Sequence, residues 1–175
     1  MSTPRDPRRP GSAEYDAYYT TYVDQVPDGD VVDFMSEQLE EALALFGDLP
    51  ADKANFRYAP DKWSTKELIG HILDTEWVFT YRALRFARGD RTALAGMDQN
   101  ALIAGSNFGD RGLRSLVDEF RNVRSANLIL FDSFDEEIMV RAGLASGCHF
   151  TVRSMLFVQA GHVQHHLEVL RERYL

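Results

Sequence analysis

The chain has 175 residues, of which 45% are hydrophobic and 26% are charged, the balance of an ordinary globular domain. Its formal net charge is -8 and its folded part has no Lys/Arg-rich stripe, which argues against binding nucleic acid through its phosphates. The single cysteine, Cys148, excludes an intramolecular disulfide, and no apolar run is long enough to span a membrane. We therefore expect one cytoplasmic domain that binds neither nucleic acid nor a membrane.

The first twelve residues are predicted to form a disordered tail. They contain three prolines and three arginines but no apolar segment of the kind found in signal peptides. The folded domain is expected to cover residues 13–175. It opens with a tyrosine-rich segment, residues 13–26, for which we predict a short helix lying across the rest of the domain.

Two long helices are predicted in the first half of the domain. Apolar residues recur every three to four positions over residues 31–47, which indicates one buried helical stripe. The second helix is predicted over residues 64–89. It begins with a capping box, in which the Ser64 and Glu67 side chains each accept a hydrogen bond from a backbone amide of the first turn.

Two more helices are predicted, over about residues 113–134 and from about residue 151 nearly to 175. No strand is expected, and residues 142–150 are predicted to be a loop because they contain two glycines. The connection over residues 90–112 is longer than an ordinary loop, which is typical of a crossover. The predicted fold is therefore all-α: an up-down-down-up four-helix bundle with a long crossover between helices 2 and 3.

Three histidines form a candidate metal site. His162 and His166 are about 40° apart around the last helix, on its core-facing stripe, so the helix can offer two ring nitrogens to one ion. His71, two turns into the second helix, supplies a third nitrogen if the two helices pack together. Neutral imidazoles suit Zn²⁺, Ni²⁺, Fe²⁺ or Cu²⁺. The alternative is a hydrogen-bonded pair of core histidines, although burying unpaired imidazoles costs free energy that a metal would remove.

Asp74 and Arg82 are further candidate site residues. Thr75 and Arg82 lie on nearly the same helical stripe as His71, and Asp74 lies at its edge, so the three side chains could line a pocket above the metal. The alternative for Arg82 is a solvated or salt-bridged surface residue. The alternative for Asp74 is that it orients a neighbouring side chain.

Several segments together resemble the DinB-like superfamily of damage-inducible, metal-binding four-helix bundles. The segments that carry the resemblance read Tyr58-Ala59-Pro60-Asp61-Lys62-Trp63-Ser64, Gly70-His71-Ile72-Leu73-Asp74-Thr75-Glu76 and Ala160-Gly161-His162-Val163-Gln164-His165-His166. The similarity covers nearly everything after about residue 14. It implies an up-down-down-up bundle, often a homodimer, in which His71, His162 and His166 bind a divalent metal such as Zn, Ni or Fe.

The resemblance also frames the possible functions, since the family includes bacillithiol S-transferases and mycothiol-dependent isomerases. The first hypothesis is a metal-dependent transferase that joins a low-molecular-weight thiol to an electrophile, with Arg82 binding the carboxylate of the thiol. The second is a metal-dependent hydrolase with Asp74 or Glu76 as the base. The third is a non-enzymatic, stress-related binding protein with a structural metal, which would need a fourth protein ligand; Asp74 is the one candidate.

Overall fold

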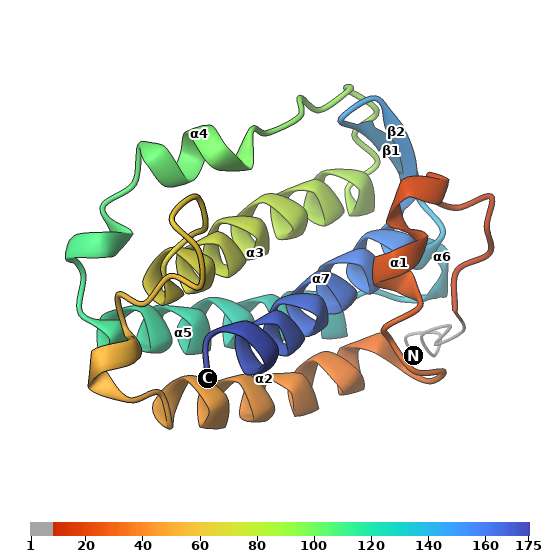
Figure 1. The fold of residues 1–175 in the computed structure, drawn as a ribbon. Coiled ribbons are helices and arrows are strands. Elements are labelled where there is room, and N and C mark those ends of the chain that lie inside the picture. Colours follow the sequence, from red (N-terminus) through yellow and green to blue (C-terminus); the bar gives the residue numbers. More distant parts are fainter. Residues whose placement is uncertain (1–8) are drawn as a thin grey trace.

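The structure is a computed structural model that describes residues 9–175 (Figure 1). Within this range four helices have 17 residues or more: α2 (Val31–Gly47), α3 (Thr65–Ala87), α5 (Leu113–Asp132) and α7 (Val152–Arg173). Helix α7 packs against α2 and α3, and α5 packs against the same two helices from the other side. The four predicted long helices are thus confirmed, whereas their up-down-down-up order and the crossover stay predictions.

Side-chain caps fix where the two histidine-bearing helices begin. Ser64 Oγ accepts a hydrogen bond from the Glu67 amide at 3.3 Å, and a Glu67 carboxylate oxygen accepts one from the Ser64 amide at 2.7 Å. The predicted capping box of α3 is therefore present. Thr151 and Ser154 form the equivalent reciprocal pair at the start of α7. Both helices thus have a defined starting residue, which sets which side chains face the core.

The tyrosine-rich segment lies against α7, as expected. It forms a 3-10 turn (Ala17–Tyr19) followed by α1 (Thr20–Val23), and α1 packs on α7. The approach is so close that a Cβ atom at Gly161 would lie 1.9 Å from the Tyr22 carbonyl oxygen. Because position 161 is a glycine, Tyr22 can lie directly beside the α7 histidines that come just after Gly161.

The prediction of a loop without strands over residues 142–150 was wrong. Strands β1 (Ala142–Ala145) and β2 (Cys148–Thr151) form an antiparallel hairpin, with Ala145 paired to Cys148. The two turn residues, Ser146 and Gly147, have φ values of 54° and 77°, which suits a tight hairpin turn. Glycines that suggest a loop in the sequence thus serve the turn and, at Gly143, the close packing of the Phe86 ring.

The long connection between α3 and α5 is partly ordered into short elements. It contains α4 (Gln99–Ala104) and a 3-10 turn (Phe108–Asp110), and Figure 1 shows it running outside α3. Its Leu94 amide donates to the Leu144 carbonyl at 2.9 Å, and the Ser146 amide donates to the Leu94 carbonyl at 3.0 Å. The β-hairpin therefore holds one end of this connection in place beside α3.

The remaining described segments are short. They include a 3-10 turn (Ala51–Lys53) and α6 (Glu136–Met139). Of the predicted tail, residues 1–8 lie outside the described residues. Arg9 contacts the domain, donating to the Val23 carbonyl at 2.8 Å and pairing with Asp28 at 3.0 Å. Across residues 9–175 no helix combines the length and the apolar character needed to cross a membrane.

Candidate metal centre

His71 of α3 and His162 and His166 of α7 converge in the space between these two helices. The Nε2 atom of His162 lies 3.0 Å from His71 Nε2 and 3.1 Å from His166 Nε2. One ring nitrogen from each of the three lies within 4.8 Å of the others, and no further His, Cys, Asp or Glu of the described residues joins this group. The three-histidine hypothesis requires the helix that contains His71 to pack beside the helix that contains His162 and His166. The structure has this packing, between α3 and α7.

The spacing of these nitrogens fits the coordination sphere of a divalent metal. Zinc–imidazole bonds are about 2.0–2.1 Å long, and ligand angles of about 90–110° then separate neighbouring nitrogens by about 2.9–3.4 Å. The two Nε2 separations at His162 fall in this range. A hydrogen-bonded explanation is weaker, because the single ring nitrogen His162 Nε2 faces two other ring nitrogens and can complete only one hydrogen bond.

The orientation of His162 is set by Thr75, one turn after His71. The Thr75 hydroxyl donates to the backbone carbonyls of Ile72 and His71, at 2.9 Å and 3.0 Å, and its oxygen lies 3.3 Å from His162 Nδ1. With the hydroxyl proton directed to the backbone, His162 Nδ1 carries its own proton and donates to Thr75. The lone pair of His162 then lies on Nε2 and points into the group of three nitrogens.

Burial keeps the three histidines neutral. Loss of solvent lowers the pKa of His71 to about 4. It also lowers the pKa of His162 and of His166 well below the usual value, and the neighbouring histidines add to the effect. The walls that exclude water include the Trp63 ring, whose centroid is 4.7 Å from that of His71. Near pH 7 all three imidazoles therefore have a lone pair available for a metal.

The fourth histidine of this region, His165, lies beside the group but is not part of it. Its ring centroid is 5.0 Å from that of His166 and 5.9 Å from that of Tyr22. Its side chain is half-buried. His166 differs from His162 in having a buried Nδ1 atom without a hydrogen-bond partner, so Thr75 has no counterpart at this ring.

Neither of the carboxylates considered as a base is directed toward the histidines. Asp74 is half-buried; burial raises its pKa, and the nearby charge of Glu119 on α5 raises it further. Glu76 is completely buried and forms an ion pair with Arg124 at 2.6 Å. Glu76 therefore faces α5, and the structure does not bring Asp74 to the centre as a fourth ligand.

Arg82 lies in a cavity of about 470 Å³ that His162 also lines, which we call the arginine cavity. The guanidinium donates to the Ala95 carbonyl and to the Ser146 hydroxyl, both at 3.0 Å. Only 4% of the residue is exposed, and among the described residues no carboxylate pairs with it. The alternative of a solvated or salt-bridged Arg82 is therefore not what the structure has. The other walls include Tyr18, Tyr19, Tyr22, Phe79 and Asp98.

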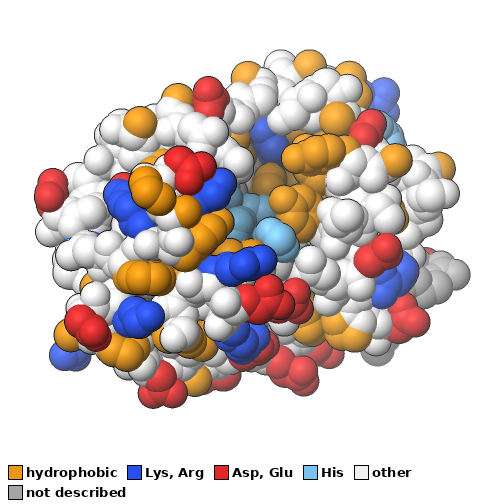
Figure 2. Space-filling view, viewed as in Figure 1, with side chains coloured by type: hydrophobic (Ala, Val, Ile, Leu, Met, Phe, Trp, Pro, Cys, Tyr) orange, Lys and Arg blue, Asp and Glu red, His pale blue; other side chains and the backbone are white. Residues whose placement is uncertain are grey.

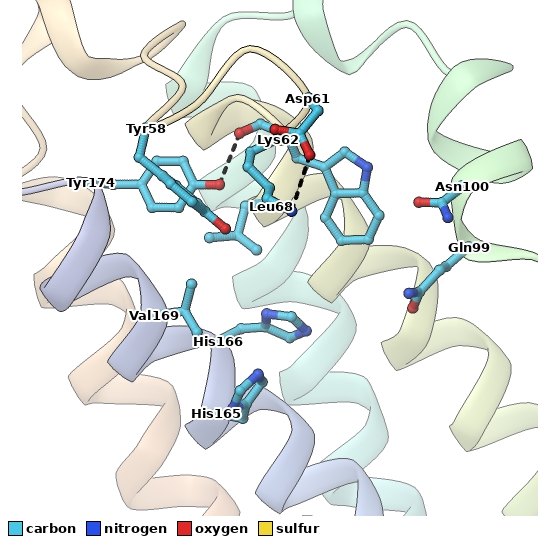
Figure 3. A pocket seen from close by; sticks show the side chains of 11 residues that line it. Tyr58, Asp61, Lys62, Leu68, Gln99, Asn100, His165, His166, Val169 and Tyr174 are labelled. Carbon is cyan, nitrogen blue, oxygen red and sulfur yellow. Dashed lines mark hydrogen bonds and ion pairs between the residues drawn. The ribbon is translucent and has the colours of Figure 1, made fainter.

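A second cavity, of about 400 Å³, lies on the His166 side of the centre, and we call it the tryptophan cavity. In Figure 3, His165 and His166 form one wall, and Tyr58 and Tyr174 lie across from them. The space-filling view shows histidine side chains at the bottom of a hollow with hydrophobic side chains around it (Figure 2). The other lining residues include Trp63, Leu68, Val169, Asp61 and Lys62.

Comparison with known proteins places the chain in a family. The sequence profile of the DinB superfamily matches residues 35–170, which is most of the chain, so the protein belongs to this superfamily. Among solved structures, YfiT from Bacillus subtilis matches with a TM-score of 0.68 at 13% identity, covering 96% of this chain and 93% of that one. YfiT is described as a probable metal-dependent hydrolase with an unusual four-helix bundle topology. No curated protein gives a significant match.

Proposed function

We propose that the protein is a metal-dependent transferase that joins a small anionic thiol to an electrophile. The observation that carries this proposal is a three-histidine centre that shares a cavity with a buried arginine, Arg82, which pairs with no carboxylate of residues 9–175. His71, His162 and His166 would hold the ion, which would act as a Lewis acid and lower the pKa of a coordinated thiol or water.

Three protein ligands are typical of catalytic rather than structural sites, because a structural ion usually has four protein ligands. Asp74 is the candidate for a fourth, and its carboxylate does not join the three ring nitrogens. The cavities on both sides of the centre would also give small molecules access to it. These features support an enzyme over a binding protein with a purely structural metal.

Arg82 would hold the anionic end of the thiol. A buried guanidinium without a counter-charge is costly, and a carboxylate in the arginine cavity would supply that charge through two parallel hydrogen bonds. Ser146 and Ala95 hold one nitrogen of the guanidinium and so orient it. The tyrosines of the same cavity would surround the organic part of the thiol and exclude water from it.

The transfer itself would form a bond between the thiol sulfur and a carbon of the electrophile. The bond from that carbon to the leaving group breaks, the leaving group keeps the electron pair, and the thiol proton passes to solvent. No general base is needed near neutral pH if the thiol is already ionised. This agrees with a site in which neither the Glu76 nor the Asp74 carboxylate joins the three ring nitrogens.

A metal-dependent hydrolase is the second candidate, and the description of YfiT favours it. Hydrolysis would need a base for the attacking water, and Asp98 is a carboxylate in the arginine cavity. One of its oxygens already accepts hydrogen bonds from the Asn100 and Ala101 amides at the start of α4. Asp98→Asn keeps this cap, since asparagine caps helices as well as aspartate, but removes the base.

The test uses zinc-loaded protein, mercaptopropionate as the thiol and chlorodinitrobenzene as the electrophile, with thioether formation followed by absorbance. We expect metal-dependent turnover that Asp98→Asn leaves intact. Arg82→Met should raise KM for mercaptopropionate about tenfold or more, but not KM for the uncharged mercaptoethanol. Absence of thioether formation, together with ester hydrolysis that Asp98→Asn abolishes, would replace the transferase with the hydrolase.

A further inference from the structure

The two cavities meet at the metal centre from different sides. His162 lines the arginine cavity and His166 lines the tryptophan cavity, and the Nε2 atoms of these two rings are 3.1 Å apart. The cavities also share Gln99 and Asn100 at the start of α4. Molecules bound in the two cavities would therefore have access to one ion at the same time.

The two cavities differ in charge. In the tryptophan cavity the charged residues are Asp61 and Lys62, which pair with each other at 3.3 Å. The arginine cavity is lined by one cation, Arg82, and one carboxylate, Asp98. Among the described residues Arg82 donates to the uncharged Ala95 carbonyl and Ser146 hydroxyl, while Asp98 accepts from amides at the start of α4. An anionic group is therefore favoured at Arg82 itself, whereas the charges of the tryptophan cavity already pair with each other.

The tryptophan cavity does contain aromatic rings that hold one another in place. Trp63 packs on His71, with ring centroids 4.7 Å apart, and its carbonyl accepts a hydrogen bond from the Tyr174 hydroxyl at 2.8 Å. Tyr58 packs edge-on against Tyr174, with centroids 5.2 Å apart. Aromatic rings held in this way offer faces and edges to another ring without a further loss of side-chain freedom.

We propose that the tryptophan cavity is the binding site for the electrophile, and that it selects an uncharged aromatic group. The site then has two compartments, with the anionic thiol beside Arg82 and the aromatic electrophile beside Trp63, and the sulfur and the reacting carbon meet at the histidines. The assignment of the two partners rests on the proposed transferase function. The selectivity of the tryptophan cavity for uncharged aromatic groups does not need turnover.

Trp63 allows this binding to be measured directly. The chain has two tryptophans, and Trp77 lies elsewhere on α3 with 55% of its surface exposed. In a Trp77→Phe background, fluorescence therefore reports on the tryptophan cavity alone. The probe is meta-dinitrobenzene, an uncharged nitroaromatic without a leaving group, which quenches tryptophan at close range. Zinc is the metal for this experiment because it does not quench.

We expect saturable quenching of Trp63 by meta-dinitrobenzene in the zinc-loaded protein. Val169→Phe, which fills the tryptophan cavity, should weaken the binding at least about tenfold, or about 1.4 kcal/mol. Tyr58→Ala is a second variant, at a side chain near the surface, and should weaken binding without filling the cavity. The matched control is Arg82→Met, which alters the other cavity and should leave the binding unchanged.

Two results would overturn the proposal. One is quenching that does not saturate or that is unaffected by both Val169→Phe and Tyr58→Ala. The other is competition between mercaptopropionate and meta-dinitrobenzene, which would mean a single shared compartment. Saturable binding with the expected variant effects but without thioether formation would instead contradict the transferase and leave the selectivity of the tryptophan cavity standing.

Discussion

Two buried polar clusters lie on opposite sides of α3 and differ in how their hydrogen bonds are completed. One is the histidine centre, to which α3 contributes His71. The other, which we call the arginine network, contains Glu76 of α3 with Arg124 and Asn127 of α5. His71 and Glu76 are five residues apart, about 140° around the helix, so one helix supplies both clusters.

The arginine network completes its bonds internally. The Arg124 guanidinium donates to both oxygens of Glu76, at 2.6 Å and 3.0 Å, and Asn127 donates to one of them at 3.0 Å. Arg124 also donates to Gln38 at 3.1 Å and to the Met35 carbonyl at 3.2 Å. Every charge is met by a partner within the protein, so this cluster needs no ligand.

The histidine centre is organised in the opposite way. Its three rings direct nitrogens toward one point, and Thr75 fixes the lone pair of His162 on the side of that point. A hydrogen bond between two of the rings can complete only one of the two contacts at His162 Nε2, whereas a cation would accept a lone pair from all three rings. The comparison teaches that burial of polar groups does not by itself mark a functional site; incomplete, convergent hydrogen bonding does.

The largest effect on stability is expected from breaking the arginine network. Arg124→Met leaves the Glu76 carboxylate buried without its charge partner, which should lower the free energy of unfolding by about 3–5 kcal/mol. Urea unfolding of the metal-free protein measures this. The double variant Glu76→Leu/Arg124→Met should recover much of the loss. If Arg124→Met is as stable as the wild type, the ion pair between Arg124 and Glu76 does not hold the buried carboxylate as described.

The histidine centre should make the stability of the metal-free protein depend on pH. The pKa of His71 is about 4 in the folded chain and about 6.5 when unfolded, so the unfolded state binds more protons between these values. Stability should therefore fall as the pH drops from about 6.5 toward 4, by up to about 3 kcal/mol from His71. Urea titrations across this range test it, and His71→Gln should make the profile shallower without removing it, because the pKa values of His162 and His166 are lowered as well.

A smaller effect is expected from the support of His162 by Thr75. Thr75→Val keeps the shape of the side chain but removes the oxygen that accepts the Nδ1 proton. Metal affinity should fall about 10- to 100-fold, measured by competition with a chromophoric chelator. Thr75→Ser retains the hydroxyl and serves as the control. Equal affinities for the valine and serine variants would show that packing alone orients the ring.

The smallest effect is expected at the start of α3, two turns before His71. Ser64→Ala removes the side-chain cap and should cost about 1 kcal/mol of stability. Fraying of the first turn should also weaken metal binding slightly. Ser64→Asp preserves a cap and should behave like the wild type. The measurement is the Tm of each variant with and without zinc. If zinc raises the Tm of Ser64→Ala as much as that of the wild type, packing rather than the cap positions His71.

The sequence predicted those features that depend on one helix at a time. Helical spacing placed His162 and His166 on one face, and the capping box located the start of α3. The sequence is less informative about which residue of a neighbouring helix a side chain contacts. Asp74 is only 60° from His71 around α3, yet its carboxylate does not join the histidine group, and Glu76 pairs with Arg124. A helical projection gives the angle but not the neighbour at that angle.

The cavities were beyond sequence reasoning for the same reason. The arginine cavity combines tyrosines from the first helical turns, Arg82 from α3, Asp98 from the long connection and Ser146 from the hairpin. The pairing of the hairpin with Leu94, together with the hydrogen bonds of Arg82 to Ala95 and Ser146, holds these segments together. The two glycines of the hairpin were interpreted as loop residues, so the element that organises this end of the cavity was missed.

Metal content tests the central claim most directly. Wild-type protein, reconstituted with zinc and then freed of loosely bound ions, should contain about one zinc ion per chain by elemental analysis. His162→Ala should lose nearly all of it, whereas the matched variant His165→Ala should retain it, because His165 lies beside the three ligands but outside them. Reconstituted wild-type protein without zinc, or equal zinc content in the two variants, would contradict the assignment of the histidine centre.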